Sequence, residues 1–131
     1  MNQIDQFNKD IYKCIQEHRT EYPDPIDLTK GEVVKVGSNA PEENWKTWIW
    51  VSKKNGKGGW VPEQLIQLIE SQDEEKKGLI LREYSAKELN ADVGAKLEKV
   101  KSMNGWTWVR NVNTNQEGWI PDEKIMRIDG R

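Results

Sequence analysis

The sequence has one cysteine and one histidine, Cys14 and His18, among its 131 residues. A single cysteine excludes an intrachain disulfide framework and a zinc site built from thiolates. We expect Cys14 to pack as a small apolar residue, because the neighbouring Tyr12 and Ile15 suggest a strand. Paired carboxylates, a phosphate-binding glycine loop and a nucleophile motif are absent as well. The sequence therefore predicts a protein that is not an enzyme and that needs no metal or cofactor.

Excess charge and long apolar runs are also missing. The chain carries 20 basic and 22 acidic residues, and neither sign forms a long run. This balance gives no electrostatic footprint for nucleic acid or for an anionic membrane. No apolar segment approaches a membrane span, and residues 1–13 are too polar for a signal peptide. If the chain is the whole gene product, these features predict a soluble, cytoplasmic protein.

Tryptophan, by contrast, is abundant, and six of the seven tryptophans lie in a pattern that occurs twice. The two copies are Trp48-Ile49-Trp50-Val51 with Gly59-Trp60-Val61-Pro62, and Trp106-Thr107-Trp108-Val109 with Gly118-Trp119-Ile120-Pro121. A repeated unit of this kind decides the domain count, so the chain is expected to contain two very small domains.

Each copy has the pattern of a β-hairpin. Alternation places Trp48 and Trp50 on one face of a strand and the aliphatic residues on the other. Turn-forming residues fill the segments 53–59 and 111–118 between the two strands. Across the hairpins, Trp60 is expected beside Trp48 and Trp50, and Trp119 beside Trp106 and Trp108.

Two interpretations of the indole faces remain open. In the first interpretation, the indoles form an exposed aromatic platform on each unit, since tryptophan is enriched where proteins bind other molecules. Alternatively, they pack on a neighbouring loop or on the other repeat, because small domains have few residues from which to build a core.

Strand and turn signals along the chain predict an all-β protein made of two small five-stranded barrels. The expected divisions are an N-terminal arm at 1–11, barrel 1 at 12–69, a linker at 70–77 and barrel 2 at 78–131. The linker is charged and has no apolar residue. An alternative for this segment is an exposed helix that extends from Pro62.

The second copy contains four segments in a characteristic order: Ile80-Leu81-Arg82-Glu83-Tyr84, Glu88 to Gly94, Trp106 and Gly118-Trp119-Ile120-Pro121. With these segments it resembles a Src-homology-3 (SH3) domain of the variant bacterial kind, whose opening strand is Ala-Leu-Tyr-Asp-Tyr and whose groove tryptophan corresponds to Trp106. The first copy is similar at Cys14 to His18, Ile26 to Gly31, Trp48 and Gly59 to Pro62. Together the two matches extend from about residue 12 to 128, so the resemblance implies tandem SH3-like barrels.

Members of this family bind proline-rich segments, which lie between aromatic rings. Carried over, the groove of the second copy keeps Tyr84, Trp106, Trp119 and Pro121, while Arg82 and Lys124 replace two tyrosines. The corresponding residues of the first copy are Gln16, His18, Trp48, Trp60, Pro62 and Leu65. His18 would then be a loop or groove residue rather than a general base, since no orienting partner is identifiable.

Acidic residues lie on the loops that flank Trp48 in this fold. They are Glu21, Asp24, Asp27, Glu42 and Glu43. A basic side chain placed over the indole between carboxylates would gain cation–π and charge attraction together. The alternative is that these residues are solvated loop charges balanced by Lys46 and Lys53.

The expected function is a non-catalytic module whose grooves bind a peptide or protein ligand, either proline-rich or basic. The candidate ligand-binding residues are Glu21, Asp24, Glu42, Glu43, Trp48, Trp50, Trp60 and Pro62 in the first copy, and Tyr84, Trp106, Trp108, Trp119 and Pro121 in the second. Two alternatives remain: a module that binds the peptides of the bacterial cell wall, and a structural role in which the tryptophans seal the barrels together.

Overall fold

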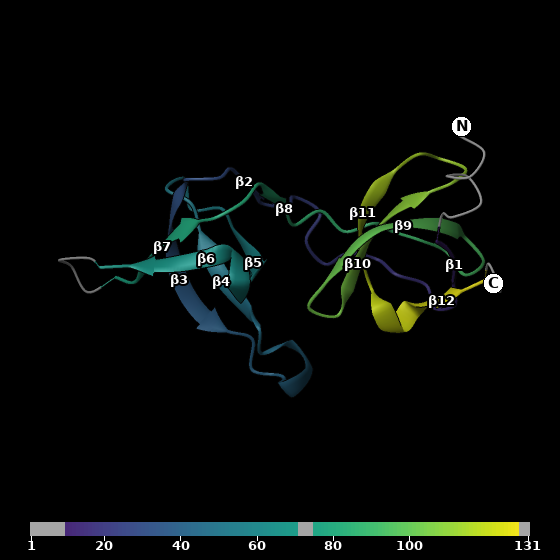
Figure 1. Ribbon diagram of the computed structural model, residues 1–131, viewed down its shortest axis with the longest axis horizontal. Coiled ribbons are helices and arrows are strands. Elements are labelled where there is room, and N and C mark those ends of the chain that lie inside the picture. Colours follow the sequence, from purple (N-terminus) through teal and green to yellow (C-terminus); the bar gives the residue numbers. More distant parts are fainter. Residues whose placement is uncertain (1–9, 71–74, 129–131) are drawn as a thin grey trace. The chain divides into compact units, whose positions relative to one another are not determined.

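The computed structural model describes residues 10–70 and 75–128, and these ranges form strands and short 3₁₀ turns without an α-helix (Figure 1). The strands are β1 (Ile11–Cys14), β2 (Asp27–Leu28), β3 (Val33–Asn39), β4 (Trp48–Ser52), β5 (Gly58–Pro62), β6 (Ile66–Ile69), β7 (Lys77–Ile80), β8 (Tyr84–Ser85), β9 (Lys96–Met103), β10 (Trp106–Asn111), β11 (Glu117–Pro121) and β12 (Ile125–Arg127). The 3₁₀ turns are η1 (Glu43–Trp45), η2 (Glu63–Leu65) and η3 (Asp122–Lys124). The all-β class is confirmed. Within the described ranges no helix could span a membrane.

The strands form two five-stranded antiparallel sheets, as expected for two SH3-like barrels. One sheet has the order β5-β4-β3-β7-β6 and the other β11-β10-β9-β1-β12, while β2 and β8 form a short ribbon. The chain divides into two compact units, which we call unit 1 and unit 2. Unit 2 is the continuous segment Pro23–Lys87, and unit 1 consists of the segments on either side of it, up to Tyr22 and from Glu88 onward.

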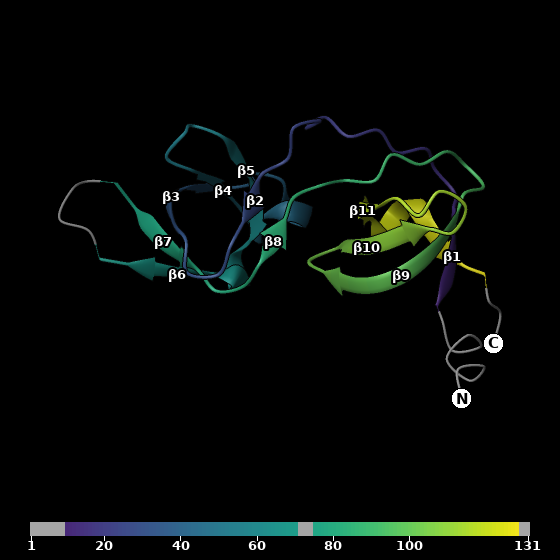
Figure 2. The same cartoon turned by 90° about the horizontal axis from the view of Figure 1, so that it is seen from above.

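The two sequence repeats exchange their opening strands. Strand β1, from the first repeat, lies between β9 and β12 of unit 1, where Tyr12 is opposite Leu97 and Arg127. Figure 2 shows β1 on the same side of the chain as β9, β10 and β11. Strand β7, from the second repeat, lies between β3 and β6 of unit 2 (Figure 1). The expected barrels at 12–69 and 78–131 follow the repeats in the sequence, whereas the compact units each combine strands of both repeats.

The exchange also changes the role of the charged segment 70–77. This segment was expected to join two barrels, but β6 and β7 pair with each other in unit 2, with Ile69 opposite Lys77. It therefore connects neighbouring strands of one sheet, and Lys77 is itself the first residue of β7. Residues 71–74 and most of the arm predicted for 1–11 lie outside the described residues. The chain passes between the units at 22–23 and again at 87–88.

Packing at one position explains why β1 lies in unit 1 and β7 in unit 2. Tyr12 is opposite Leu97 in unit 1, and the equivalent residue in unit 2 is Gly78, which is opposite Val34. A Cβ atom on Gly78 would lie only 2.5 Å from Cγ2 of Ile66. A tyrosine cannot occupy that place, because closely packed interiors accommodate even one added carbon at a cost. Tyr12 instead packs against the core of unit 1.

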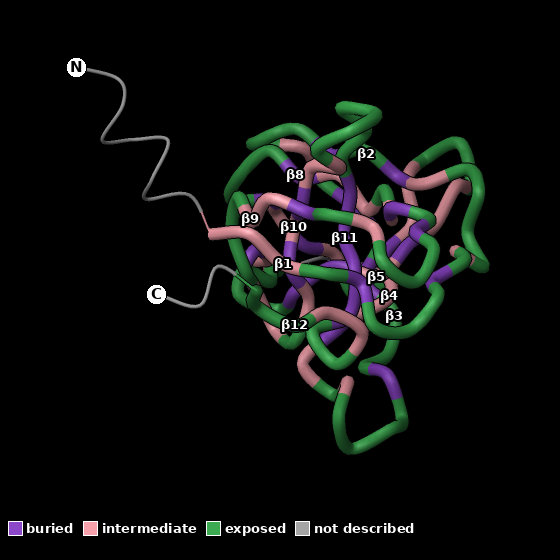
Figure 3. Tube along the Cα trace, turned by 90° about the vertical axis from the view of Figure 1, so that its right-hand side faces the viewer, coloured by how far each residue is buried: buried purple, intermediate pink, exposed green. Residues whose placement is uncertain are grey.

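Each unit has a core of buried aliphatic side chains. Figure 3 marks the buried positions along the chain in purple. Val109 is fully buried and Thr107 nearly so, while Trp106 and Trp108 on the opposite face of β10 are half-buried, as the alternation predicted. Cys14 is also fully buried, which confirms its predicted packing role. The core of unit 1 contains Cys14, Leu89, Ala91, Leu97, Val109 and Ile120. Unit 2 buries Ile26, Leu28, Val34, Val51, Val61 and Ile80.

Candidate functional site

Both hairpins carry an indole pair across their strands. The ring centroids of Trp50 and Trp60 are 5.2 Å apart at an interplanar angle of 79°. Those of Trp108 and Trp119 are 5.4 Å apart at 84°. Edge-to-face geometry of this kind is favourable, because the positive edge of one ring meets the negative face of the other. The predicted placement of Trp60 beside Trp50, and of Trp119 beside Trp108, is confirmed.

The indoles differ in how much of their surface is available. Trp48 is only 6% exposed and Trp119 only 3%. Half-buried indoles are those of Trp50, Trp60, Trp106 and Trp108, whereas Pro62 and Pro121 are buried. The tryptophans thus form neither a fully open platform nor a fully packed layer. Of the six hairpin indoles, these four are the ones that can offer ring surface to a ligand; Trp45, outside the hairpins in η1, is half-buried as well.

His18 lies beside Trp106 in unit 1. Their ring centroids are 5.7 Å apart in an edge-to-face arrangement. Nε2 of His18 lies 2.7 Å from Oε1 of Glu88, and its Nδ1 lies 2.9 Å from Nζ of Lys124. Because an ammonium group can only donate, Nδ1 accepts from Lys124 and the Nε2–H group donates to Glu88. His18, from the first repeat, is thereby held by two side chains of the second.

Tyr84 lies in the other unit. Its hydroxyl group donates a hydrogen bond of 2.9 Å to the backbone carbonyl oxygen of Trp60. The sequence comparison correctly made His18 and Tyr84 equivalent, but it placed Tyr84 with Trp106 and His18 with Trp48. The strand exchange reverses both assignments, so Tyr84 accompanies the first hairpin and His18 the second.

A lysine lies over the indole pair of unit 1. Nζ of Lys101 is 5.8 Å from the ring centroid of Trp108 and 5.7 Å from that of Trp119. On the same hairpin, the indole N–H of Trp108 donates a 2.8 Å hydrogen bond to Oε1 of Glu117. Glu117 was missed in the sequence analysis. Strands β10 and β11 pair regularly, with Arg110 opposite Glu117, so the Glu117–Trp108 contact depends on where the two side chains point. A register irregularity that the local sequence pattern does not reveal lies instead between β10 and β9, where it places Val109 opposite Lys99 and Arg110 opposite Glu98.

In unit 2, Trp50 lies against a glycine. A Cβ atom on Gly58 would come within 2.6 Å of Cζ2 of Trp50, so only a glycine leaves room for this ring position. The corresponding position in unit 1 is Glu117, which meets Trp108 through its carboxylate. The two indole pairs share a geometry but differ in the residue beside them.

The acidic candidates do not gather around one indole. Glu21 belongs to unit 1, whereas Asp24, Glu42 and Glu43 belong to unit 2, and all four are exposed. Asp24 pairs with Lys57, and Glu43 with Lys46. Trp48, which they were expected to flank, has little exposed surface. These observations favour solvated loop charges.

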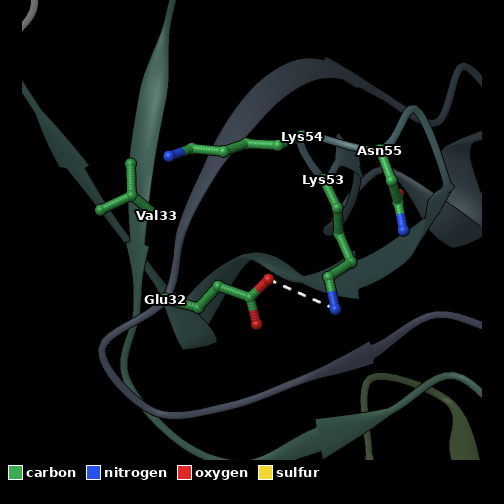
Figure 4. A pocket seen from close by; sticks show the side chains of 5 residues that line it. All are labelled: Glu32, Val33, Lys53, Lys54 and Asn55. Carbon is green, nitrogen blue, oxygen red and sulfur yellow. Dashed lines mark ion pairs between the residues drawn. The ribbon is translucent and has the colours of Figure 1, made fainter.

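A shallow hollow in unit 2 lies away from the predicted residues (Figure 4). Nζ of Lys53 lies 3.4 Å from Oε2 of Glu32 and donates a 2.9 Å hydrogen bond to the carbonyl oxygen of Asp27. Its charge is therefore already matched within the unit. The lining residues are Glu32, Val33, Lys53, Lys54 and Asn55.

Cys14 has the environment of a structural thiol. Its Sγ donates to the carbonyl oxygen of Gln16 at 3.1 Å. Burial raises the pKa of the Cys14 thiol above its ordinary value of 9.0. A thiol that stays protonated at neutral pH is a poor nucleophile. Within the described ranges, no group of three or more His, Cys, Asp or Glu residues is arranged to hold a metal ion.

One family model matches the chain. It is described as a variant SH3 domain and covers residues 11–69. The match begins at β1 and ends at β6, so it follows the first repeat in the sequence. No curated protein matches the chain significantly.

Proposed function

We propose, from the match of residues 11–69 to the variant SH3 domain family, that the chain is a non-catalytic module that binds an extended peptide segment of a partner protein. The observation that carries the proposal is the half-buried indole of Trp106, which lies edge to face with the imidazole ring of His18. Domains of this fold type bind preformed, extended segments, because ordering such a segment costs little entropy.

The surroundings of Trp106 provide the contacts that an extended peptide needs. The exposed part of the indole can pack against a proline ring, and Pro121 is opposite Trp106 in the hairpin. Lys124 contacts His18 through its ammonium group. That group has three N–H donors, so it can also donate to a ligand carbonyl while it keeps this contact.

Unit 2 offers a second indole surface. Trp50 and Trp60 are half-buried and lie edge to face. Two sites on one chain would raise the apparent affinity for a partner that carries two suitable segments, because the second contact forms within the complex.

A peptide array tests the proposal. It would hold proline-containing peptides with basic or neutral flanks, together with the stem peptides of bacterial cell walls. The full chain is compared with Trp106→Ala and with Val93→Ala, a control at a side chain that is 63% exposed in the turn before β9. We expect Trp106→Ala alone to lose binding while its circular dichroism is unchanged.

The other outcomes separate the alternatives. Equal binding by all three proteins would place the site elsewhere. Binding of wall stem peptides alone would support a cell-wall module, and an array without any bound peptide would contradict a peptide-binding function.

A further inference from the structure

Three strands of unit 1 place a cation and two indoles in one row. Lys101 on β9 is opposite Trp108 on β10, and Trp108 is opposite Trp119 on β11. Directly opposite side chains on one face of a sheet are close enough to interact. The row therefore explains why Nζ of Lys101 lies within 6 Å of both rings, the range in which an ammonium is attracted to a ring face.

The next row of the same sheet fixes the Trp108 ring in this position. It pairs Glu98, Arg110 and Glu117 across the three strands, and Nη2 of Arg110 lies 2.6 Å from Oε1 of Glu98. Glu117 accepts the indole N–H of Trp108. The hydrogen bond holds the Trp108 ring in the position that presents its surface to Lys101.

We propose that Lys101 is a resident cation of the Trp108–Trp119 pair, and that it determines specificity by excluding arginine and lysine side chains of a ligand from these rings. The inference rests on the proposed function and adds the charge that unit 1 accepts. Both candidate occupants are cations attracted to the same ring surface, so one must leave before the other can bind. Because Lys101 is part of the chain, its effective local concentration is on the order of millimolar.

The consequence is a difference in ligand choice that one residue controls. With Lys101 present, unit 1 favours peptides whose side chain at the Trp108–Trp119 pair carries no positive charge. Without it, the half-buried Trp108 ring of this pair accepts a guanidinium or ammonium group. The exposed position of Lys101 means that its replacement leaves the core of unit 1 intact.

Argininamide tests the proposal on the intact 131-residue chain and requires no known partner. The probe is titrated while the indole N–H resonance of Trp108 is followed by NMR. In Lys101→Ala, the half-saturating concentration should fall by roughly two- to five-fold relative to the original chain, which corresponds to the usual strength of an exposed cation–π contact. Lys101→Arg should behave as the original chain does.

Lys99→Ala is the matched control. Lys99 is on the same strand, but it is opposite Val109 instead of an indole. Lys99→Ala changes the net charge by the same amount as Lys101→Ala. It uncovers no indole, because Lys99 is opposite Val109, so the half-saturating concentration should stay unchanged. An equal titration in Lys101→Ala and the original chain would overturn the proposal, and so would an equal fall in Lys99→Ala, because the effect would then be general electrostatics.

The titration separates this inference from the proposed function. If the array finds no peptide, the peptide-binding function fails, while argininamide still decides whether Lys101 covers the rings. If peptides bind and argininamide shows no effect of Lys101, the function stands and the specificity role fails.

Discussion

Nε2 of His18 lies 2.7 Å from Oε1 of Glu88, although 70 residues separate them in the sequence. Lys124 completes this contact on the other side of the imidazole. In the first repeat, the positions equivalent to Glu88 and Lys124 hold Pro25 and Leu65. Neither side chain can form a hydrogen bond with an imidazole. The exchange of opening strands is therefore encoded by complementary side chains as well as by the glycine at position 78.

Replacing His18 should weaken unit 1 and leave unit 2 unchanged. His18→Ala removes the partner of Glu88 and Lys124, and an unpaired, partly buried polar group costs about 1–3 kcal/mol. Urea unfolding followed by NMR, with separate resonances for each unit, measures the loss. A selective loss in unit 2 would contradict the placement of His18 in unit 1.

Tyr84→Phe is the complementary change in the other unit. It removes only the hydroxyl group that donates to the Trp60 carbonyl oxygen. We expect a loss of about 1 kcal/mol in unit 2 alone, the usual net contribution of a hydrogen bond. The same urea experiment applies. If the two repeats did not exchange strands, the effects of the two variants would appear in the opposite units.

The continuous segment 23–87 should fold as an isolated fragment, because it contains every strand of the unit 2 sheet. Residues 12–69 should not fold, since this fragment lacks β7 and its own opening strand carries Tyr12 where unit 2 needs Gly78. Amide dispersion in NMR spectra and cooperative thermal unfolding distinguish the two. A cooperatively folded 12–69 fragment would show that β1 can replace β7.

Much of the fold follows from the sequence because it depends on local patterns. The alternation around Trp48 and Trp106 predicts the hairpins, and the repeated Gly-Trp-Val/Ile-Pro motif identifies β5 and β11. The exchange depends on contacts between distant segments, such as the fit of Gly78 against Ile66. Alignment of the repeats reveals that Tyr12 and Gly78 are equivalent, but it does not reveal which sheet each one enters.

The site could be predicted only in part for the same reason. Cross-strand neighbours within a hairpin, such as Trp108 and Trp119, follow from alternation. The burial of Trp48 and the contact of Lys101 with two rings depend on how loops and neighbouring strands cover each indole. The burial of Trp48 and the contact of Lys101 can be seen only in the three-dimensional arrangement, since the equivalent positions of the other repeat do not share them.

Trp48 and Trp106 should respond differently to replacement, despite their equivalent positions. Trp48 is 6% exposed, so Trp48→Ala should destabilise unit 2 by about 3–5 kcal/mol through loss of buried surface and a cavity. Trp106 is half-buried, and Trp106→Ala should cost unit 1 less than that while it weakens ligand binding. Thermal unfolding of both variants gives the comparison, and equal destabilisation would show that Trp106 is as much a core residue as Trp48.

Cys14 should make the stability of unit 1 fall at alkaline pH. Burial raises the pKa of its thiol in the folded state above the ordinary 9.0, so the unfolded chain loses this proton first as the pH rises. The contribution of the Cys14 thiol to the free energy of unfolding is therefore complete below pH 9.0 and is lost as the pH rises through the raised pKa. Urea unfolding of unit 1 is compared in the original chain and in Cys14→Ala, below and above pH 9.0. The original chain should lose more stability than Cys14→Ala over this interval, because the variant has no thiol to ionise. All other ionisable groups are the same in both proteins, so their effects cancel in the comparison, and an identical decline in both would contradict the raised pKa.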